Sequence, residues 1–225
     1  YSGVTFQSNP TTGIITNAGW ASYFAETQQE AAQNSATLLP ELPSTVLAGE
    51  RLIEASTAKG FKFIHSPIFG IETDFSSEIE ALTQSGSKSL VWGSSGSRLI
   101  QFLNSLSEYD PEYRFDFTNC FQNCYNPNWV GNAGLTGEGI SVWLPHLPIE
   151  EAELNDELLR YLFYMNATHG AKANPSAAGI AAWSAALLFQ EAVSRAVGTD
   201  SASYKPESLT RQSVIDAANG ITFWD

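Results

Sequence analysis

Few side chains in this sequence are of the types that carry out catalysis. It has three histidines, His65, His146 and His169, and no two of them have the spacing of zinc ligands. The motifs H-E-x-x-H and C-x-x-C do not occur. No histidine sits where a general base is expected, so the sequence predicts no catalytic residue, no metal site and no cofactor.

A glycine- and serine-rich turn is the strongest candidate for ligand chemistry. Its sequence from Trp92 to Ser97 is Trp-Gly-Ser-Ser-Gly-Ser. This resembles the nucleophile elbow G-x-S-x-G around Ser95, but Ser97 stands where the closing glycine belongs. The spacing also differs from that of a Walker loop or of G-x-G-x-x-G. What remains is a turn into a helix N-terminus, where backbone N–H groups and hydroxyls can hold a polar or anionic group. An ordinary β-α turn is the alternative, with equal weight.

The only two cysteines, Cys120 and Cys124, lie close together in an aromatic, asparagine-rich stretch. Structural zinc requires four ligands, and no histidine or further cysteine lies nearby, so a zinc site is a poor interpretation. A local disulfide fits better. It would stabilise the fold by about 2 kcal/mol and would indicate an oxidising, extracytoplasmic location. Two reduced, half-buried thiols are the alternative.

Composition restricts the class of partner. Eleven basic and 24 acidic residues give a net charge of −13, which repels nucleic acid and anionic lipid surfaces. We find no stretch that approaches the roughly 20 apolar residues needed to cross a bilayer. The chain begins at Tyr1 without a basic, apolar leader, and we therefore expect a soluble mature protein or one whose leader was removed.

From about residue 35, short apolar runs alternate with amphipathic stretches, the pattern of repeated β-α units around a parallel sheet. Ser44 and Asp74 are expected to cap the first two helices of this region. A short strand at residues 4–7 and a helix at 20–33 precede it, and only helices follow it. The predicted strands are residues 36–39, 61–66, 89–92, 113–117 and 140–144. The predicted helices are residues 45–58, 75–83, 97–106, 155–167, 176–197 and 208–218.

In an open parallel sheet, ligands bind outside the carboxyl ends of the strands. Four loops follow the predicted strands, at residues 41–45, 66–69, 92–95 and 119–125. They combine hydroxyl, amide and aromatic side chains, as pockets for small polar or amphipathic molecules do. Tryptophans are more often core residues than ligand contacts, but Trp92 at a strand's carboxyl end is expected to face the ligand.

Several segments resemble type I periplasmic binding proteins, in particular the branched-chain amino-acid receptors of ABC transporters. Two strand and helix segments carry the resemblance: Gly60-Phe-Lys-Phe with Thr73-Asp-Phe-Ser, and Ser85-Gly with Leu90-Val-Trp-Gly. Gly137-Glu-Gly-Ile and the long helix from Pro175 to Ala192 are also similar to family segments. The resemblance extends over nearly the whole chain, although its motifs are degenerate.

The resemblance implies an α/β fold with a Rossmann-like parallel sheet flanked by helices, in a fragment of a two-lobed protein. Residues 1–34 would cross from the first lobe, 35–147 would form the second, and 148–225 would return to the first. It implies a monomeric extracytoplasmic receptor, periplasmic or lipid-anchored, that delivers a small solute to the membrane permease of an ABC transporter. The implied ligand-binding residues are Ser44, Thr45, Trp92, Gly93, Ser94, Ser95, Asn119, Phe121 and Gln122.

One departure from the family pattern concerns the ligand. Amino-acid receptors of this family place an acidic residue near the last of these loops to meet the ammonium group, and residues 119–122 contain none. An amino acid is therefore only narrowly favoured over another small polar or aromatic metabolite. A sensor domain of the same fold and an α/β hydrolase or transferase are the alternative functions, because fold alone does not determine function.

Overall fold

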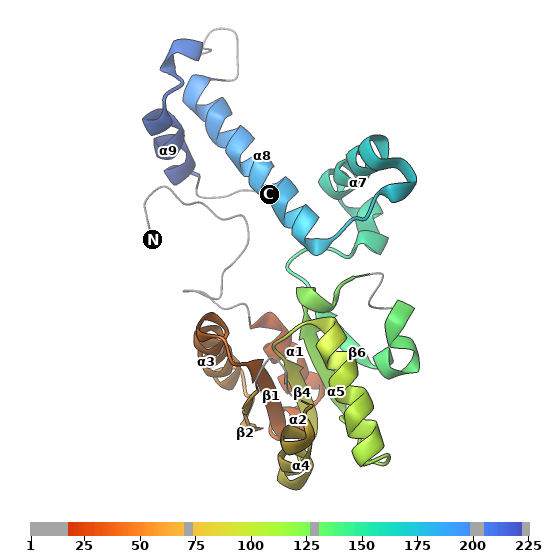
Figure 1. Cartoon of the computed structure of the whole chain (residues 1–225). Helices are drawn as coiled ribbons and strands as arrows, with labels where there is room; N and C mark the ends of the chain where they lie inside the picture. Colours follow the sequence, from red (N-terminus) through yellow and green to blue (C-terminus); the bar gives the residue numbers. More distant parts are fainter. Residues whose placement is uncertain (1–17, 70–73, 127–130, 199–204, 222–225) are drawn as a thin grey trace. The chain divides into compact units, whose positions relative to one another are not determined.

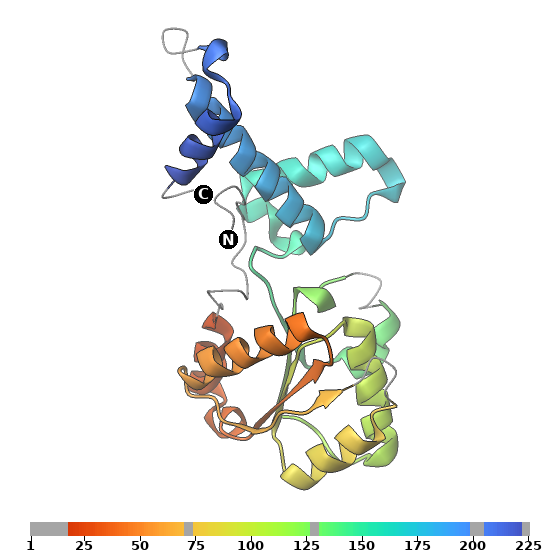
Figure 2. The same ribbon diagram turned by 60° about the vertical axis from the view of Figure 1, so that its left-hand side comes forward.

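The computed structural model describes residues 18–69, 74–126, 131–198 and 205–221, and for residues 43–45, 68 and 69 it describes the backbone alone. Contacts divide the chain into two compact units. One comprises residues 10–146, and the other comprises residues 1–9 and 147–225. The elements of each unit can be followed by their colours in Figures 1 and 2.

The unit 10–146 is built on a six-stranded sheet of order β2-β1-β4-β5-β6, with β3 also paired to β1. Every pairing between described strands is parallel. The sheet confirms the predicted α/β class with a parallel sheet. The strands are β1 (Ser35–Pro40), β2 (Phe63–His65), β3 (Ile68–Phe69), β4 (Ser89–Trp92), β5 (Phe117–Phe121) and β6 (Ile140–Trp143).

Helices cover both faces of this sheet, and alternate strand residues point to opposite faces. On β4, Val91 packs with helices α1, α2 and α3, whereas Leu90 and Trp92 pack with α4 and α5. The helices are α1 (Gly19–Thr27), α2 (Gln29–Ala32), α3 (Pro43–Thr57), α4 (Ser76–Ser85) and α5 (Gly96–Tyr109).

The face under α4 and α5 holds the larger core. Trp92 is 0% exposed, and its ring lies 5.5 Å from the Phe102 ring and 6.1 Å from the Phe75 ring. Leu99 and Leu106 of α5 recur at helical spacing and pack into the same cluster. Burial of these aromatic and aliphatic side chains fixes α5 on the sheet, and α5 begins directly after the Gly/Ser turn.

The face under α1, α2 and α3 combines aromatic packing with buried polar groups. Trp20 of α1 lies 5.1 Å from Phe61 and 5.6 Å from Phe121, ring centre to ring centre. At the amino ends of β1 and β4, the hydroxyls of Ser35 and Ser89 lie 2.6 Å apart, and both also bond to the Ala31 carbonyl of α2. These buried hydroxyls are satisfied, as buried polar groups ordinarily are.

Strand β5 begins four residues later than the sequence predicts. We expected residues 113–117 because Tyr113, Phe115 and Phe117 alternate, but only Phe117 belongs to the observed strand. Tyr113 and Phe115 instead pack against the edge of the core before the strand starts, and the Tyr113 hydroxyl donates to the Ser87 carbonyl at 2.5 Å. The shift places Asn119, Cys120 and Phe121 within the strand instead of in the loop after it.

Helix starts also differ from the predictions. Helix α3 begins at Pro43, with Leu42 as its N-cap, so Ser44 lies inside the helix and does not cap it. Phe75 is the N-cap of α4, with a left-handed φ of 63°, and the preceding Asp74 carboxylate accepts from the Ser76 N–H at 3.0 Å. The predicted helix at residues 20–33 is two helices, α1 and α2, separated at Gln28.

The described part of the unit 147–225 contains helices and no strand, as the sequence predicts for this region. Its small core joins Leu158 and Tyr161 of α7 to Ile180 of α8. Trp183 packs against this cluster, and its indole N–H donates to the Glu157 carboxylate at 3.4 Å. The elements are η3 (Ile149–Leu154), α7 (Asp156–His169), η4 (Gly170–Lys172), α8 (Ala177–Val197), η5 (Pro206–Ser208) and α9 (Arg211–Asn219).

Helix α8 corrects one expectation. Its 21 residues are long and apolar enough to cross a membrane on length and composition alone, whereas we expected no such segment. This is weak evidence for a membrane span, because the core helix of a soluble protein satisfies the same test.

The predicted lobe boundaries stay a prediction. Helices α1 and α2 precede residue 35, yet they pack on the sheet of the unit 10–146. The strand predicted at residues 4–7 lies outside the described residues.

Candidate functional site

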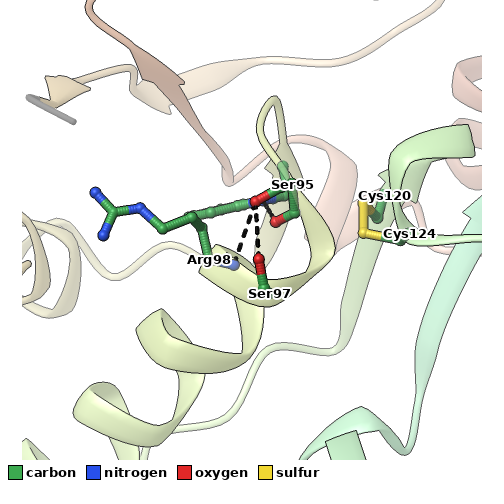
Figure 3. Close-up of a disulfide and its surroundings, with 6 residues drawn as sticks. Ser95, Ser97, Arg98, Cys120 and Cys124 are labelled. Carbon is green, nitrogen blue, oxygen red and sulfur yellow. Dashed lines mark hydrogen bonds between the residues drawn. A yellow bond between two sulfur atoms is a disulfide. The ribbon is translucent and has the colours of Figure 1, made fainter. Parts of the chain in front are cut away.

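The carboxyl edge of the sheet brings together the loops that the sequence selects. Because all strands are parallel, β1, β4 and β5 end at the same edge. Leu38 of β1 pairs with Trp92, the last residue of β4. Val91 of β4 pairs with Asn119, which lies two residues before the end of β5. The turns that follow β4 and β5 therefore begin at nearly the same level of the sheet. The carboxyl edge of the sheet therefore carries both the Gly/Ser turn at residues 92–97 and the disulfide-bonded segment at residues 120–124, as Figure 3 shows.

The turn from β4 into α5 presents hydroxyls at a helix N-terminus (Figure 3). Ser95 is the N-cap, and its hydroxyl accepts from the Arg98 N–H at 3.4 Å and lies 3.2 Å from the Ser97 hydroxyl. Ser95 is exposed and Ser94 is half-buried. At Gly93, a Cβ would lie 2.6 Å from the Leu39 side chain, so glycine allows the close approach to β1. The turn can therefore offer hydrogen bonds to a polar group at the edge.

Trp92 does not face this edge. Its side chain is fully buried in the core under α4 and α5, and its indole N–H donates to the Ser95 carbonyl at 2.9 Å. We expected the Trp92 ring to contact a ligand, but the ring is wholly buried and offers no surface to a solute. We therefore assign Trp92 a packing role. Through its hydrogen bond, Trp92 also holds the Ser95 backbone in place.

The segment after β5 is closed by a disulfide between Cys120 and Cys124, as predicted. The two Cα atoms lie 6.1 Å apart, and both residues are fully buried (Figure 3). Between them, the short helix η1 (Gln122–Cys124) leaves Gln122 exposed, while Phe121 is half-buried against Trp20. The crosslink thus holds the backbone that carries the exposed Gln122 amide.

Asn119 is a second correction. Because β5 starts late, Asn119 lies inside the strand, is 0% exposed and points to the face under α1. Neither end of its amide has a hydrogen-bond partner among the described residues, and the same holds for the nearby Thr37 hydroxyl. We assign Asn119 to the interior of the unit and not to the exposed edge. A buried amide of this kind is ordinarily satisfied by ordered water, which we expect here.

The remaining predicted positions are placed by their backbone. Ser44 and Thr45 are the second and third residues of α3, in the turn that follows β1, and their side chains lie outside what the structure describes. The loop at residues 66–69 contains β3, which pairs with the carboxyl end of β1 through Leu39 and Pro40. Both segments lie at the predicted edge of the sheet, and their contact with a ligand stays a prediction.

The histidines take positions that fit packing. His65 ends β2, and burial lowers the pKa of its imidazole, which favours the neutral form. His146 lies 6.1 Å from the Tyr125 ring, centre to centre. Among the described residues, no three His, Cys, Asp or Glu side chains gather as metal ligands.

The sequence reasoning missed Arg98 in the first turn of α5. Its guanidinium lies 5.1 Å from the centre of the Phe75 ring and donates to the Gln101 side chain at 3.0 Å. A basic residue three positions after a serine N-cap could have indicated a cation close to the predicted turn.

Comparison with known proteins identifies the fold. A family profile described as periplasmic binding protein matches residues 2–225. A search of curated proteins finds no significant match. Among solved structures, the chain is similar to the leucine-, isoleucine-, valine-, threonine- and alanine-binding protein from Brucella ovis, with 16% identity and a TM-score of 0.71. The match covers 94% of this chain and 50% of that protein.

Two further solved structures are similar. One is a putative branched-chain amino acid ABC transporter protein from Silicibacter pomeroyi, with 14% identity, a TM-score of 0.70, and coverage of 97% of this chain and 54% of that one. The other is a solute-binding protein of an ABC transporter from R. palustris in complex with benzoate, with 16% identity, a TM-score of 0.68, and coverage of 95% and 54%.

The chain spans about half the length of these structures. The parallel sheet flanked by helices is the type I fold of these proteins. Since the family profile matches nearly every residue, the chain belongs to the periplasmic binding protein family.

Proposed function

We propose that this protein captures a small polar or amphipathic solute between two lobes and is not an enzyme. The observation that carries the proposal is the family match over residues 2–225. The carboxyl edge of the sheet supports it, because this edge offers the hydroxyls of Ser94 and Ser95 and the amide of Gln122, groups suited to hydrogen bonding.

We further propose an extracytoplasmic location, in the periplasm or anchored by lipid at the cell surface. The buried disulfide at the edge supports such a location, because disulfides persist in oxidising compartments. The protein would act as a monomer and deliver its solute to the permease of an ABC transporter. Hinge closure of the two lobes would remove the solute from water.

The solute class follows from the charges at the edge. Residues 119–122 contain no carboxylate to meet an ammonium group, while Arg98 is three residues after Ser95 in α5 and its guanidinium lies over the Phe75 ring. An amino acid or a related carboxylate is the ligand class we propose. The structurally similar proteins include one that binds leucine, isoleucine, valine, threonine and alanine and one solved with benzoate.

The proposal is tested by thermal stabilisation of the intact protein with aliphatic amino acids and with benzoate. Saturable stabilisation without chemical change of the solute is the expected result, because binding to the folded state alone raises the melting temperature. Conversion of a stabilising compound into product would contradict the proposal and support an enzyme. Failure of every compound to stabilise the protein would contradict the proposed ligand class.

A pair of amide variants locates the binding site. Gln122→Ala removes an exposed amide at the carboxyl edge and should weaken solute binding by about tenfold, the effect of one lost hydrogen bond to a charged or polar ligand group. Gln84→Ala, an amide of α4 that bonds to Glu80 of its own helix, is the matched control and should leave affinity unchanged. Equal affinity of both variants and the unaltered protein would place the site elsewhere.

A further inference from the structure

A cavity of about 580 Å3 lies at the amino edge of the sheet, away from the carboxyl edge discussed above. It is bounded by the C-terminal half of α5, by residues 113–118 around the start of β5, and by residues 135–140, which lead into β6. All of these residues belong to the unit 10–146. Pockets for small molecules commonly have volumes of about 300–1,000 Å3, so the cavity is of a suitable size.

The floor of this cavity is formed by hydrophobic side chains at the edge of the core under α4 and α5, where they are only partly buried. Four of its residues, Leu103, Tyr113, Phe115 and Ile140, are partly buried hydrophobic residues that pack against that core. At the rim, Leu135 is 83% exposed. An occupant with an apolar body would remove this apolar surface from water, which is favourable in proportion to the area covered.

One buried polar group is directed into the cavity. Thr118 of β5 lies between Leu90 and Ile140 in register, is 6% exposed and contributes to the cavity lining. Thr118 is not among the residues with a buried, unpartnered side-chain atom, so its hydroxyl reaches the cavity and is not sealed in the interior. A polar group of an occupant could take the place of water as the hydrogen-bond partner of this hydroxyl.

The charges around the rim determine the class of occupant. Three carboxylates, of Glu108, Asp116 and Glu138, line the cavity together with the basic side chain of Arg114, and outside the lining the Lys88 ammonium interacts with the Asp116 carboxylate. The Arg114 guanidinium donates to the Tyr113 carbonyl at 2.7 Å. Helix α5 ends beside the cavity at Tyr109, and the C-terminal end of a helix carries partial negative charge. The rim therefore favours a cation and disfavours an anion.

Tyr113 contributes apolar surface and no charge. Burial, with a smaller contribution from the Asp110 carboxylate, raises the pKa of Tyr113 to about 12. The phenol stays protonated at neutral pH and its hydroxyl is already engaged with the Ser87 carbonyl.

We propose that this cavity is a second ligand site that binds a small amphipathic organic cation, with its apolar body on the floor and its ammonium group at the acidic rim. The proposal does not rest on the solute-binding function at the carboxyl edge.

The test uses three probes with the same apolar body: phenylbutylamine, phenylbutanol and phenylbutyrate, titrated into the intact protein by calorimetry. The amine should bind about tenfold more tightly than the carboxylate, with the neutral alcohol between them, because exposed charge pairs each contribute modestly. Added salt should reduce the advantage of the amine. Equal binding of amine and alcohol would overturn the cationic class, and binding of none of them would overturn the site.

Variants of the lining separate this site from the carboxyl edge. Thr118→Val keeps the shape of the side chain but removes the hydroxyl, and Glu138→Gln removes one exposed rim charge; each should weaken amine binding by about threefold to tenfold. Glu112→Gln alters an exposed carboxylate outside the lining and is the matched control. If Thr118→Val fails to fold, Glu138→Gln decides. Unchanged amine affinity in Glu138→Gln, or its loss in Gln122→Ala, would overturn the proposal.

Discussion

The two units of this chain bury their helices differently. In the unit 10–146, the sheet accepts apolar side chains on both faces, and Trp20, Trp92 and Phe102 are all 0% exposed. In the unit 147–225, Phe163 is 67% exposed and Phe189 is 64% exposed. A helix packed only on other helices covers one stripe of its surface, whereas a parallel sheet offers a continuous apolar layer. Tertiary packing therefore stabilises α5 more than α8, although α8 is longer.

Substituting one aromatic side chain in each unit should test this comparison most strongly. Trp92→Ala should lower the free energy of unfolding of the unit 10–146 by about 3–5 kcal/mol, because it leaves a cavity in a closed core. Phe163→Ala, on an exposed face of α7, should change stability by no more than about 0.5 kcal/mol. Urea unfolding followed by circular dichroism measures both changes. Similar losses in the two variants would show that the units are packed alike.

The disulfide should have the next largest effect. Replacing Cys120 and Cys124 together by serine should destabilise the unit 10–146 by about 2 kcal/mol, since a short crosslink restricts the unfolded chain. Unfolding in urea with and without a thiol reductant measures this contribution. Reductant should bring the unaltered protein to the stability of the variant and leave the variant unchanged. A variant as stable as the oxidised protein would contradict the prediction.

Each unit has a helix with a serine N-cap, and removing each cap should have a smaller effect than removing the disulfide. Ser95 caps α5 and Ser176 caps α8, each accepting from an N–H three residues later. Ser95→Ala should lower the unfolding free energy of the unit 10–146 by about 1 kcal/mol, because α5 is anchored to the core. Ser176→Ala should increase amide hydrogen exchange mainly in the first turn of α8, because the first N–H groups of the helix lose their side-chain acceptor.

The control for the caps is Ser107→Ala, an exposed position within α5, which should not destabilise the protein. Exchange that rises throughout the unit 147–225 in Ser176→Ala would show that α8 unfolds cooperatively with its neighbours.

The smallest expected effect is the pH dependence from His65. Burial lowers the folded-state pKa of this imidazole below its ordinary 6.5, so the unfolded state takes up a proton first as the pH falls. The stability of the unit 10–146 should therefore decrease slightly as the pH falls through the ordinary imidazole pKa of 6.5, and His65→Gln should flatten this slope. His169→Gln, in the exposed last turn of α7, is the control. A slope that survives in His65→Gln would assign it to another group.

Local patterns in the sequence predicted much of the fold. Strand β4 matches its predicted residues because Ser89–Trp92 is a short apolar run bounded by polar residues. The five helices predicted after residue 75 were located to within a few residues at each end, since apolar spacing and N-cap residues act locally. The close pair of cysteines also predicted its own disulfide.

The same patterns misplaced β5 and, with it, part of the site. The alternation of Tyr113, Phe115 and Phe117 reads as a strand, but alternation cannot tell a paired residue from one that packs beside the sheet. Asn119 was therefore expected in a loop and lies in the interior. The chemical type of Trp92 fits both a ligand contact and a core residue, and only its packing against Phe75 and Phe102 distinguished the two.

The sequence by itself determined the order of the elements and the division into a region with a parallel sheet followed by a region of helices, because both follow from local periodicity. It also determined which loops lie at the carboxyl edge, because parallel strands all end at the same edge. Only the tertiary structure decided which side chains of those loops are exposed. The amino-edge cavity likewise depends on residues from α5, β5 and β6 that are far apart in the chain, and their meeting is set by register and packing, which no local pattern records.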